Sequence, residues 1–129
     1  MSGGNPGEDE SETVCESDGK WDWIEELPVA ATVCDPEGII LAMNDASIAT
    51  FAADGGAALV GTNVFDCHPE PARGKLRAIM AERRTNVYTI EKRGVKKLIY
   101  QAPWTEDGVY AGFVELAFEI PFEMPHFVR

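Results

Sequence analysis

The sequence predicts an α+β domain in which helices cover one face of an antiparallel β-sheet. Five apolar, partly β-branched segments bounded by turn sequences predict strands, two of them before residue 45 and three after residue 86. Between these two groups of strands, an Ala-rich stretch and an amphipathic stretch predict helices. Strands at both ends of a chain with helices in the middle are typical of α+β domains.

The chain of 129 residues fits one domain with tails at both ends. Residues 1–19 are rich in Gly, Ser and acidic side chains, and predict a disordered tail and linker. A short N-terminal flanking helix is expected near Lys20–Glu26, because Pro28 disfavours helical backbone before it. The domain is expected over residues 20–120, and two prolines in residues 121–129 predict a C-terminal tail without regular structure.

A β-hairpin and a short helix are expected next. Val29–Cys34 and Ile39–Asn44 are the apolar segments, and the Asp-Pro-Glu-Gly sequence between them is typical of a turn. Asn44 or Asp45 can cap a helix over Ala46–Phe51, where alanine favours helix.

The second half begins with the long helix. Leu76, Ile79 and Met80 after Pro71 have a three-to-four spacing, which predicts one amphipathic helix. Three strands are then expected, joined by two short turns: Val87–Lys92, Val95–Trp104 and Val109–Ile120, with Arg93-Gly94 and Thr105-Glu106-Asp107-Gly108 between them.

Charge, hydropathy and cysteine content argue against nucleic-acid binding, membrane insertion and a disulfide-bonded fold. The formal net charge of -11 argues against nucleic acid as a partner, because phosphate contacts need a basic surface. The polar, acidic N-terminus does not resemble a signal peptide, and no apolar run is long enough to span a bilayer, so a soluble, cytoplasmic protein without membrane contact is expected. The three cysteines are too scattered for a disulfide framework.

Positive charge is concentrated in one part of the chain. Residues 73–97 contain nine of the eleven basic residues and only Glu82 and Glu91 as acids. The segment is interpreted as the solvated side of a helix and a strand edge, and the alternative is a docking surface for an anionic group.

Three motifs in this order and spacing resemble the PAS domain family over about residues 24–120. The first is "LPVAATVCDPEGIILAMNDAS", the second is "LVGTNVFDCHPEPARGKL" with Cys-His-Pro at the helix entry, and the third is "DGVYAGFVELAFEI". The resemblance implies a five-stranded antiparallel sheet with helices over one face. It further implies a sensor or interaction domain, not an enzyme, and no paired carboxylates, P-loop or catalytic triad stands out in the sequence. No output module is evident, so a signal is expected to pass to a separate partner protein.

The "FDCHPEP" stretch at residues 65–71 admits several interpretations. Zinc needs three or four convergent ligands, and neither a metal site nor a thiol nucleophile is expected from Cys67 and His68 alone. The main interpretation is a helix start, in which prolines and acids suit the first turn. The sharpest alternative is haem, with His68 as axial ligand and Arg73 or Arg77 as contacts for the anionic propionates. The cofactor therefore stays open.

A ligand pocket is expected between the sheet and the long helix. One phase of the fourth strand places its apolar side chains together, opposite the apolar side of the helix. The predicted lining is Leu98, Tyr100, Trp104, Ile79 and Met80, with His68 and Tyr100 as polar anchors. The alternative is a packed core without a ligand, which would make the domain a pure protein-interaction module.

A homodimer is expected because Trp21 and Trp23 in the flanking helix have no evident core position. Together with Ile24 they are predicted to pack on the outer face of the sheet. Phe113 is assigned to that face from the alternation of the last strand.

Overall fold

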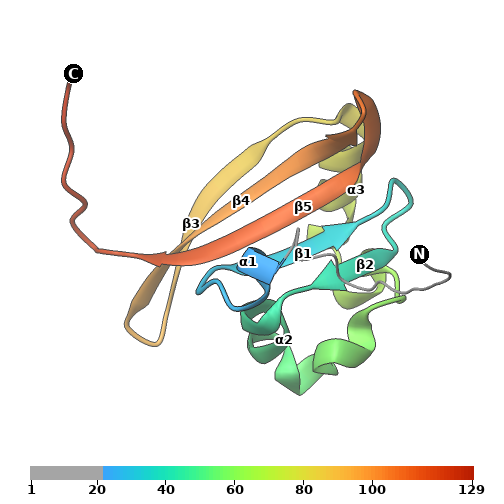
Figure 1. Ribbon diagram of the computed structural model, residues 1–129, viewed down its shortest axis with the longest axis horizontal. Coiled ribbons are helices and arrows are strands. Elements are labelled where there is room, and N and C mark those ends of the chain that lie inside the picture. Colours follow the sequence, from blue (N-terminus) through green and yellow to red (C-terminus); the bar gives the residue numbers. More distant parts are fainter. Residues whose placement is uncertain (1–21) are drawn as a thin grey trace, which may run out of the picture.

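The computed structural model describes residues 22–129, apart from the side chain of Asp22, and has a five-stranded antiparallel sheet with helices (Figure 1). The elements are α1 (Asp22–Glu25), β1 (Ala30–Cys34), β2 (Ile40–Met43), α2 (Asp45–Thr50), η1 (Ala52–Asp54), η2 (Gly56–Leu59), η3 (Val64–Cys67), α3 (Ala72–Glu82), β3 (Asn86–Lys92), β4 (Val95–Glu106) and β5 (Val109–Ile120). The predicted fold class is confirmed. The residues for which a disordered tail was predicted, and Trp21, lie outside the described residues.

The strand order in the sheet is β2-β1-β5-β4-β3, so the first and last strands of the chain are neighbours at its centre. Both edges are formed by short strands, four residues in β2 and seven in β3. All helices between β2 and β3 belong to one continuous excursion of the chain, which leaves the sheet and returns to it (Figure 1). Residues 121–129 form no helix or strand and extend away from the sheet.

Paired residues of neighbouring antiparallel strands present their side chains on the same face of the sheet. Thr32 pairs with Glu115, Glu115 with Gln101, and Gln101 with Asn86, so four polar side chains form a row across β1, β5, β4 and β3. We call this face the inner face. The outer face holds the intervening residues, including Leu116 opposite Tyr100.

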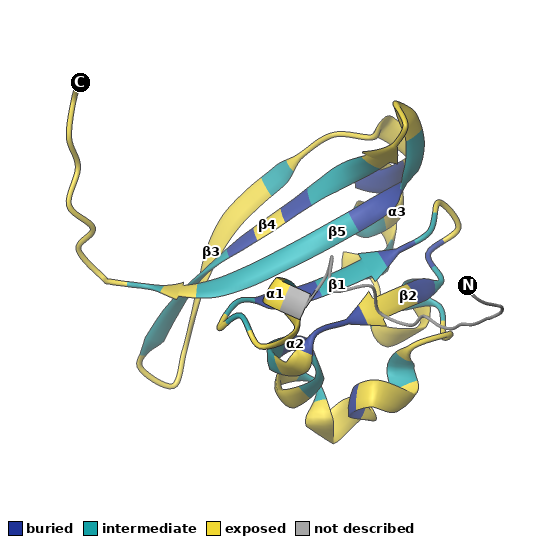
Figure 2. Ribbon diagram, viewed as in Figure 1, coloured by how far each residue is buried: buried dark blue, intermediate teal, exposed yellow. Residues whose placement is uncertain are grey.

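The core lies between the inner face and α3. Cys34 and Phe113 from the sheet pack with Ile79 and Met80 from α3 and with Phe65 from η3. Figure 2 shows buried residues on β1, β5 and α3 and exposed residues over most of β3. This small core is one side of the cavity described below.

Local chemistry explains the first turn of α2. Asn44, which is 4% exposed, precedes α2, and its Oδ1 accepts hydrogen bonds from the backbone N–H of Ser47 at 3.1 Å and of Ala31 at 2.9 Å. Its Nδ2 donates to the carbonyl oxygens of Ile24 at 2.9 Å and Val29 at 2.8 Å. One amide side chain thus caps α2 and holds α1 and β1 against it.

Positive φ angles mark two tight turns and one position inside β5. The β3–β4 and β4–β5 connections are two-residue turns in which Arg93-Gly94 and Asp107-Gly108 all have positive φ angles, typical of tight hairpins. Gly112 in β5 has a φ of +136°, and a Cβ there would lie 1.9 Å from the carbonyl oxygen of Cys34. Opposite Gly112, the indole N–H of Trp104 donates to that same carbonyl oxygen at 3.2 Å.

Candidate functional site

A cavity of about 490 Å³ lies between the inner face of the sheet, η3 and α3. Its wall on the sheet carries Thr32, Cys34, Gln101, Phe113 and Glu115. Ile40 and Met43 of β2, which pair with Cys34 and Thr32, belong to this sheet side, as does Val114 of β5. The opposite side is formed by residues of the helical excursion, namely Phe51, Asp54, Leu59, Val64, Asp66, Cys67, His68, Leu76 and Met80. Its volume lies in the range of small-molecule sites, which are typically apolar with a few fixed polar groups.

His68 lies at the end of η3, half-buried, and lines this cavity. Its Nδ1 is 2.9 Å from the carbonyl oxygen of Val64, so Nδ1 carries the proton and donates to the loop. In the singly protonated ring this contact leaves Nε2 as an acceptor. The imidazole therefore bonds back to its own loop and also contributes to the cavity wall.

The helix start that was expected in "FDCHPEP" is present, although in two steps. The residues before His68 form the short η3, and α3 begins at Ala72 after Pro71. Glu70 accepts a hydrogen bond from the backbone N–H of Gly74 at 3.0 Å, as expected for an acid at a helix N-terminus.

The row of polar side chains on the sheet is connected by hydrogen bonds. Asn86 Nδ2 donates to Gln101 Oε1 at 3.0 Å, and Gln101 Nε2 donates to Glu115 Oε1 at 2.8 Å. On the other side of Glu115, the hydroxyls of Thr32 and Ser47 are hydrogen-bonded to each other. The charge of Glu115 also reaches Tyr88, whose pKa is raised first by burial and second by this carboxylate.

The cavity brings together only part of the residues predicted to line a ligand pocket. His68 and Met80 line the cavity, whereas Ile79 is buried in the adjacent core cluster. Leu98, Tyr100 and Trp104 were predicted on the inner side, and this placement is wrong because Gln101, their neighbour in β4, faces the cavity and they alternate with it onto the outer face. Sequence reasoning missed Thr32, Gln101 and Glu115 as cavity residues. Glu115 shares a face with Phe113 in β5 because the two residues are two positions apart. The assignment of Phe113 to the outer face therefore placed Glu115 there as well.

The predicted dimer surface also changes. Phe113 is 4% exposed and belongs to the core cluster, so its assignment to the outer face is wrong. The side chain of Trp23 is 62% exposed, whereas Ile24 is half-buried. Tyr100, at 38% exposed, is an aromatic residue that does lie on the outer face.

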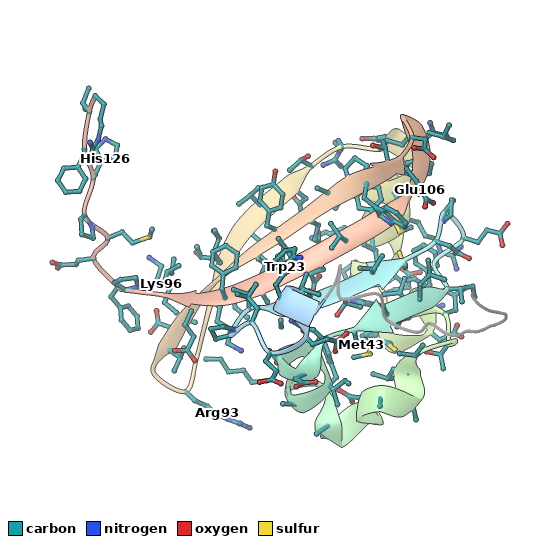
Figure 3. The ribbon with its side chains drawn as sticks, viewed as in Figure 1. Trp23, Met43, Arg93, Lys96, Glu106 and His126 are labelled. Atoms are coloured by element: carbon teal, nitrogen blue, oxygen red, sulfur yellow. The ribbon has the colours of Figure 1, made fainter. Side chains whose placement is uncertain are left out.

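The basic residues do not form one surface. Figure 3 shows Arg93 and Lys96 at the far end of the sheet from Glu106, and Figure 1 shows α3 near the Glu106 end. Arg73 donates from Nε to the carbonyl oxygen of His68 at 3.0 Å, and the guanidinium of Arg77 lies 4.5 Å from the centre of the Phe65 ring.

The residues of the cavity do not fit a haem. His68 could offer an imidazole nitrogen, but two anionic propionates need cations. The cavity lining contains three carboxylates, from Asp54, Asp66 and Glu115, and no Lys or Arg. Arg73 and Arg77, which were predicted to contact propionates, are absent from the lining.

Within residues 22–129, no group of three or more His, Cys, Asp or Glu side chains is arranged to hold a metal ion. The second histidine, His126, lies on the C-terminal extension (Figure 3). None of the described helices has the length and apolar character needed to cross a membrane.

Comparison with solved structures identifies the fold. The PAS domain of BvgS from Bordetella pertussis superposes with a TM-score of 0.58 and 19% sequence identity, over 77% of this chain and 82% of that one. The Aer2 receptor from Vibrio cholerae, described as a dual PAS-haem oxygen sensor, gives a TM-score of 0.57 and 24% identity over 72% of this chain and 95% of that one. The photoactive yellow protein domain of the histidine kinase Ppr from Rhodospirillum centenum gives 0.52 and 20%, over 74% and 88%.

The chain therefore has the PAS fold, as its sequence motifs indicated. No protein-family model and no curated protein sequence matches it. At these identities the likeness concerns the fold alone, so function has to be argued from the cavity and the surfaces of this chain.

Proposed function

We propose that this PAS-like domain is a sensor that binds a small ligand in the inner-face cavity and passes a signal to a separate partner protein. The cavity itself carries the proposal. Its volume of about 490 Å³ suits a small molecule, and its wall combines apolar residues such as Met43 and Met80 with the fixed polar groups of His68, Gln101 and Glu115. Domains of the same fold from a receptor and from a sensor histidine kinase support a role in signalling.

The cavity arises from the way the inner face is built. A packed core requires large apolar side chains on the sheet, but β1, β5 and β4 place Thr32, Glu115 and Gln101 there in one row. These polar side chains leave the apolar cluster confined to one end, around Phe113 and Met80. The space that remains is lined by hydrogen-bonding groups held in fixed orientations, which is the arrangement that gives ligand specificity.

Native mass spectrometry of the protein purified from its expression host tests this role. We expect a non-covalent mass that is lost on denaturation, or a ligand from a metabolite library that raises the melting temperature. A protein without bound mass and without any thermal shift would instead favour a ligand-free interaction module. This proposal assigns no enzymatic activity to the domain.

Homodimerisation is a second role, favoured by exposed aromatic surface. Trp23 in α1 is 62% exposed and Tyr100 on the outer face is 38% exposed. Exposed aromatic side chains are candidates for contact with a partner. We propose that α1 and the outer face together form the interface of a dimer.

Sedimentation velocity at tens of micromolar tests the dimer. Trp23→Ala and Tyr100→Glu should both shift the protein toward monomer. Val109→Ala is the matched control, because Val109 is 67% exposed but lies at the β4–β5 turn. A monomeric parent protein, or a dimer that neither variant weakens, contradicts the proposal.

A further inference from the structure

We propose that the ligand of the inner-face cavity is a small amine whose ammonium group binds Glu115 and whose apolar body packs against α3. This inference depends on the proposed role as a ligand-binding sensor and names the chemical class of the ligand. It is carried by the charge of the cavity lining, by the fixed orientation of Glu115 and by the position of His68.

The charge of the lining excludes most anionic ligands. Three carboxylates line the cavity, from Asp54, Asp66 and Glu115, and no Lys or Arg accompanies them. The nearby Arg73 and Arg77 are engaged outside the cavity, with the His68 carbonyl oxygen and the Phe65 ring. In a partly enclosed site of reduced dielectric, carboxylates attract a cation and repel an anion more strongly than they do in water.

Among the three acids, Glu115 is the one held on the cavity wall. Asp54 and Asp66 are exposed, whereas Glu115 is half-buried in the central strand of the sheet. Gln101, which is 8% exposed, donates to Glu115 Oε1 and is itself oriented by the amide of Asn86. This chain of hydrogen bonds fixes the carboxylate and occupies one of its two oxygens.

The carboxylate of Glu115 has no cationic partner within the described part of the chain. The ion pair found there joins Arg84 and Glu82 on the surface, far along the sequence from Glu115. Among the described residues Gln101 is the one hydrogen-bond donor to this carboxylate, so its second oxygen is left without a protein donor. A bound ammonium group would supply both the positive charge and the missing hydrogen-bond donors.

The rest of the cavity indicates the shape of the ligand. Phe113, Met80 and Leu76 offer an apolar surface next to Glu115 for a hydrocarbon or aromatic body. On the helical side, His68 donates from Nδ1 to Val64, and Nε2 of the singly protonated ring is an acceptor. Both polar anchors are therefore acceptors, and a ligand with an amine at one end and a hydroxyl at the other satisfies them.

Three probes with a common phenol body test the inference by calorimetry. Tyramine is a cation, N-acetyltyramine is neutral, and 4-hydroxyphenylpropionate is an anion. We expect tyramine to bind about 10- to 100-fold more tightly than the other two, the difference that a charge-assisted hydrogen bond supplies. In Glu115→Gln this preference should disappear, while the affinity for N-acetyltyramine stays the same.

Glu106→Gln is the matched control, because it removes the same charge from an exposed residue outside the cavity. It should leave all three affinities unchanged. Gln at position 115 keeps an acceptor for Gln101, and if that variant fails to fold, the probe series on the parent protein still decides the question. The inference is overturned if tyramine does not bind at about 1 mM, or if the neutral or anionic probe binds as well as tyramine does.

These outcomes separate the two proposals. Binding of the neutral or anionic probe, or a native mass identified as an anion, rejects the amine but retains the ligand-binding sensor. A protein that binds no probe, carries no bound mass and responds to no member of a metabolite library rejects both.

Discussion

Replacing Gly112 by alanine should destabilise the domain by about 2–6 kcal/mol, as the sum of two costs. The φ of +136° lies in a region that L-residues rarely adopt, which costs about 1–3 kcal/mol. The added Cβ would also lie 1.9 Å from the Cys34 carbonyl oxygen and 2.8 Å from backbone atoms of Asp35. Because these atoms belong to the backbone of β1 and its turn, relief requires the strands to separate locally, which adds about 1–3 kcal/mol.

Urea unfolding followed by far-ultraviolet circular dichroism measures this cost. Small domains have a total stability of only about 5–15 kcal/mol. We therefore expect the urea concentration at the midpoint of unfolding to fall strongly, or the variant not to fold at all. Gly94→Ala and Gly108→Ala are matched controls, because both glycines have positive φ but a Cβ at either would meet nothing within 4 Å. The free energy of unfolding of these two variants should fall by only about 1–2 kcal/mol, the cost of a residue other than glycine in left-handed backbone. A Gly112→Ala midpoint equal to those of the controls would refute the close approach of β5 to β1.

Three further predictions concern buried polar groups and cofactor binding. Asn44→Ala should cost about 2–4 kcal/mol in urea unfolding, because it removes four hydrogen bonds and leaves buried groups such as the Ala31 N–H without a partner; a loss below about 1 kcal/mol would contradict this. Burial raises the pKa of the Cys34 thiol above its ordinary value of 9.0, so the folded protein retains a proton that the unfolded chain releases. That contribution to stability is fully present below pH 9.0 and is lost as the pH rises toward the folded-state pKa, and in Cys34→Ala the fall between pH 9 and pH 10 should be smaller. Addition of haem should produce no Soret shift that depends on His68, because the cavity lining has no cation for the propionates; a shift that His68→Ala abolishes would show that reasoning to be wrong.

The fold was predictable from local sequence signals. The Asp-Pro-Glu-Gly turn, the cap at Asn44 and the two glycine-containing turns each act over a few residues, and each is present in the structure. The pairing of β3 with β4 follows from its turn alone, because a two-residue turn at Arg93-Gly94 places Lys92 opposite Val95 and Asn86 opposite Gln101.

Phe113 and the apolar side chains of β4 were predicted on opposite faces, and they are, but inner and outer were exchanged because alternation does not tell which face α3 covers. The pairing of β4 with β5 also contains one irregularity. If the Asp107-Gly108 turn alone set the register, Phe113 would pair with Ala102, and the apolar side chains of β4 would share its face. The structure has a register shift beside Trp104, so that Trp104 pairs with Gly112 and Phe113 with Pro103. A shift of one residue exchanges the two faces of a strand. The pairing of Gln101 with Glu115 in the polar row therefore depends on a bulge that the local sequence does not predict.

The two edges of the sheet differ in how well they resist another strand. At β2, the chain covers its own edge: Ile40 N–H donates to the Thr62 carbonyl, Gly61 N–H donates to the Ile40 carbonyl, and Ile39 is bridged to Asn63. β3 pairs only with β4 within the described residues and exposes Val87, Tyr88 and Ile90 along its length. An open edge with β-branched and aromatic side chains is a template for strand addition. An extended peptide that lengthens this sheet, whether from a partner or from an aggregating copy, is therefore expected to add beside β3 rather than beside β2, where the chain's own loop already pairs with Ile40.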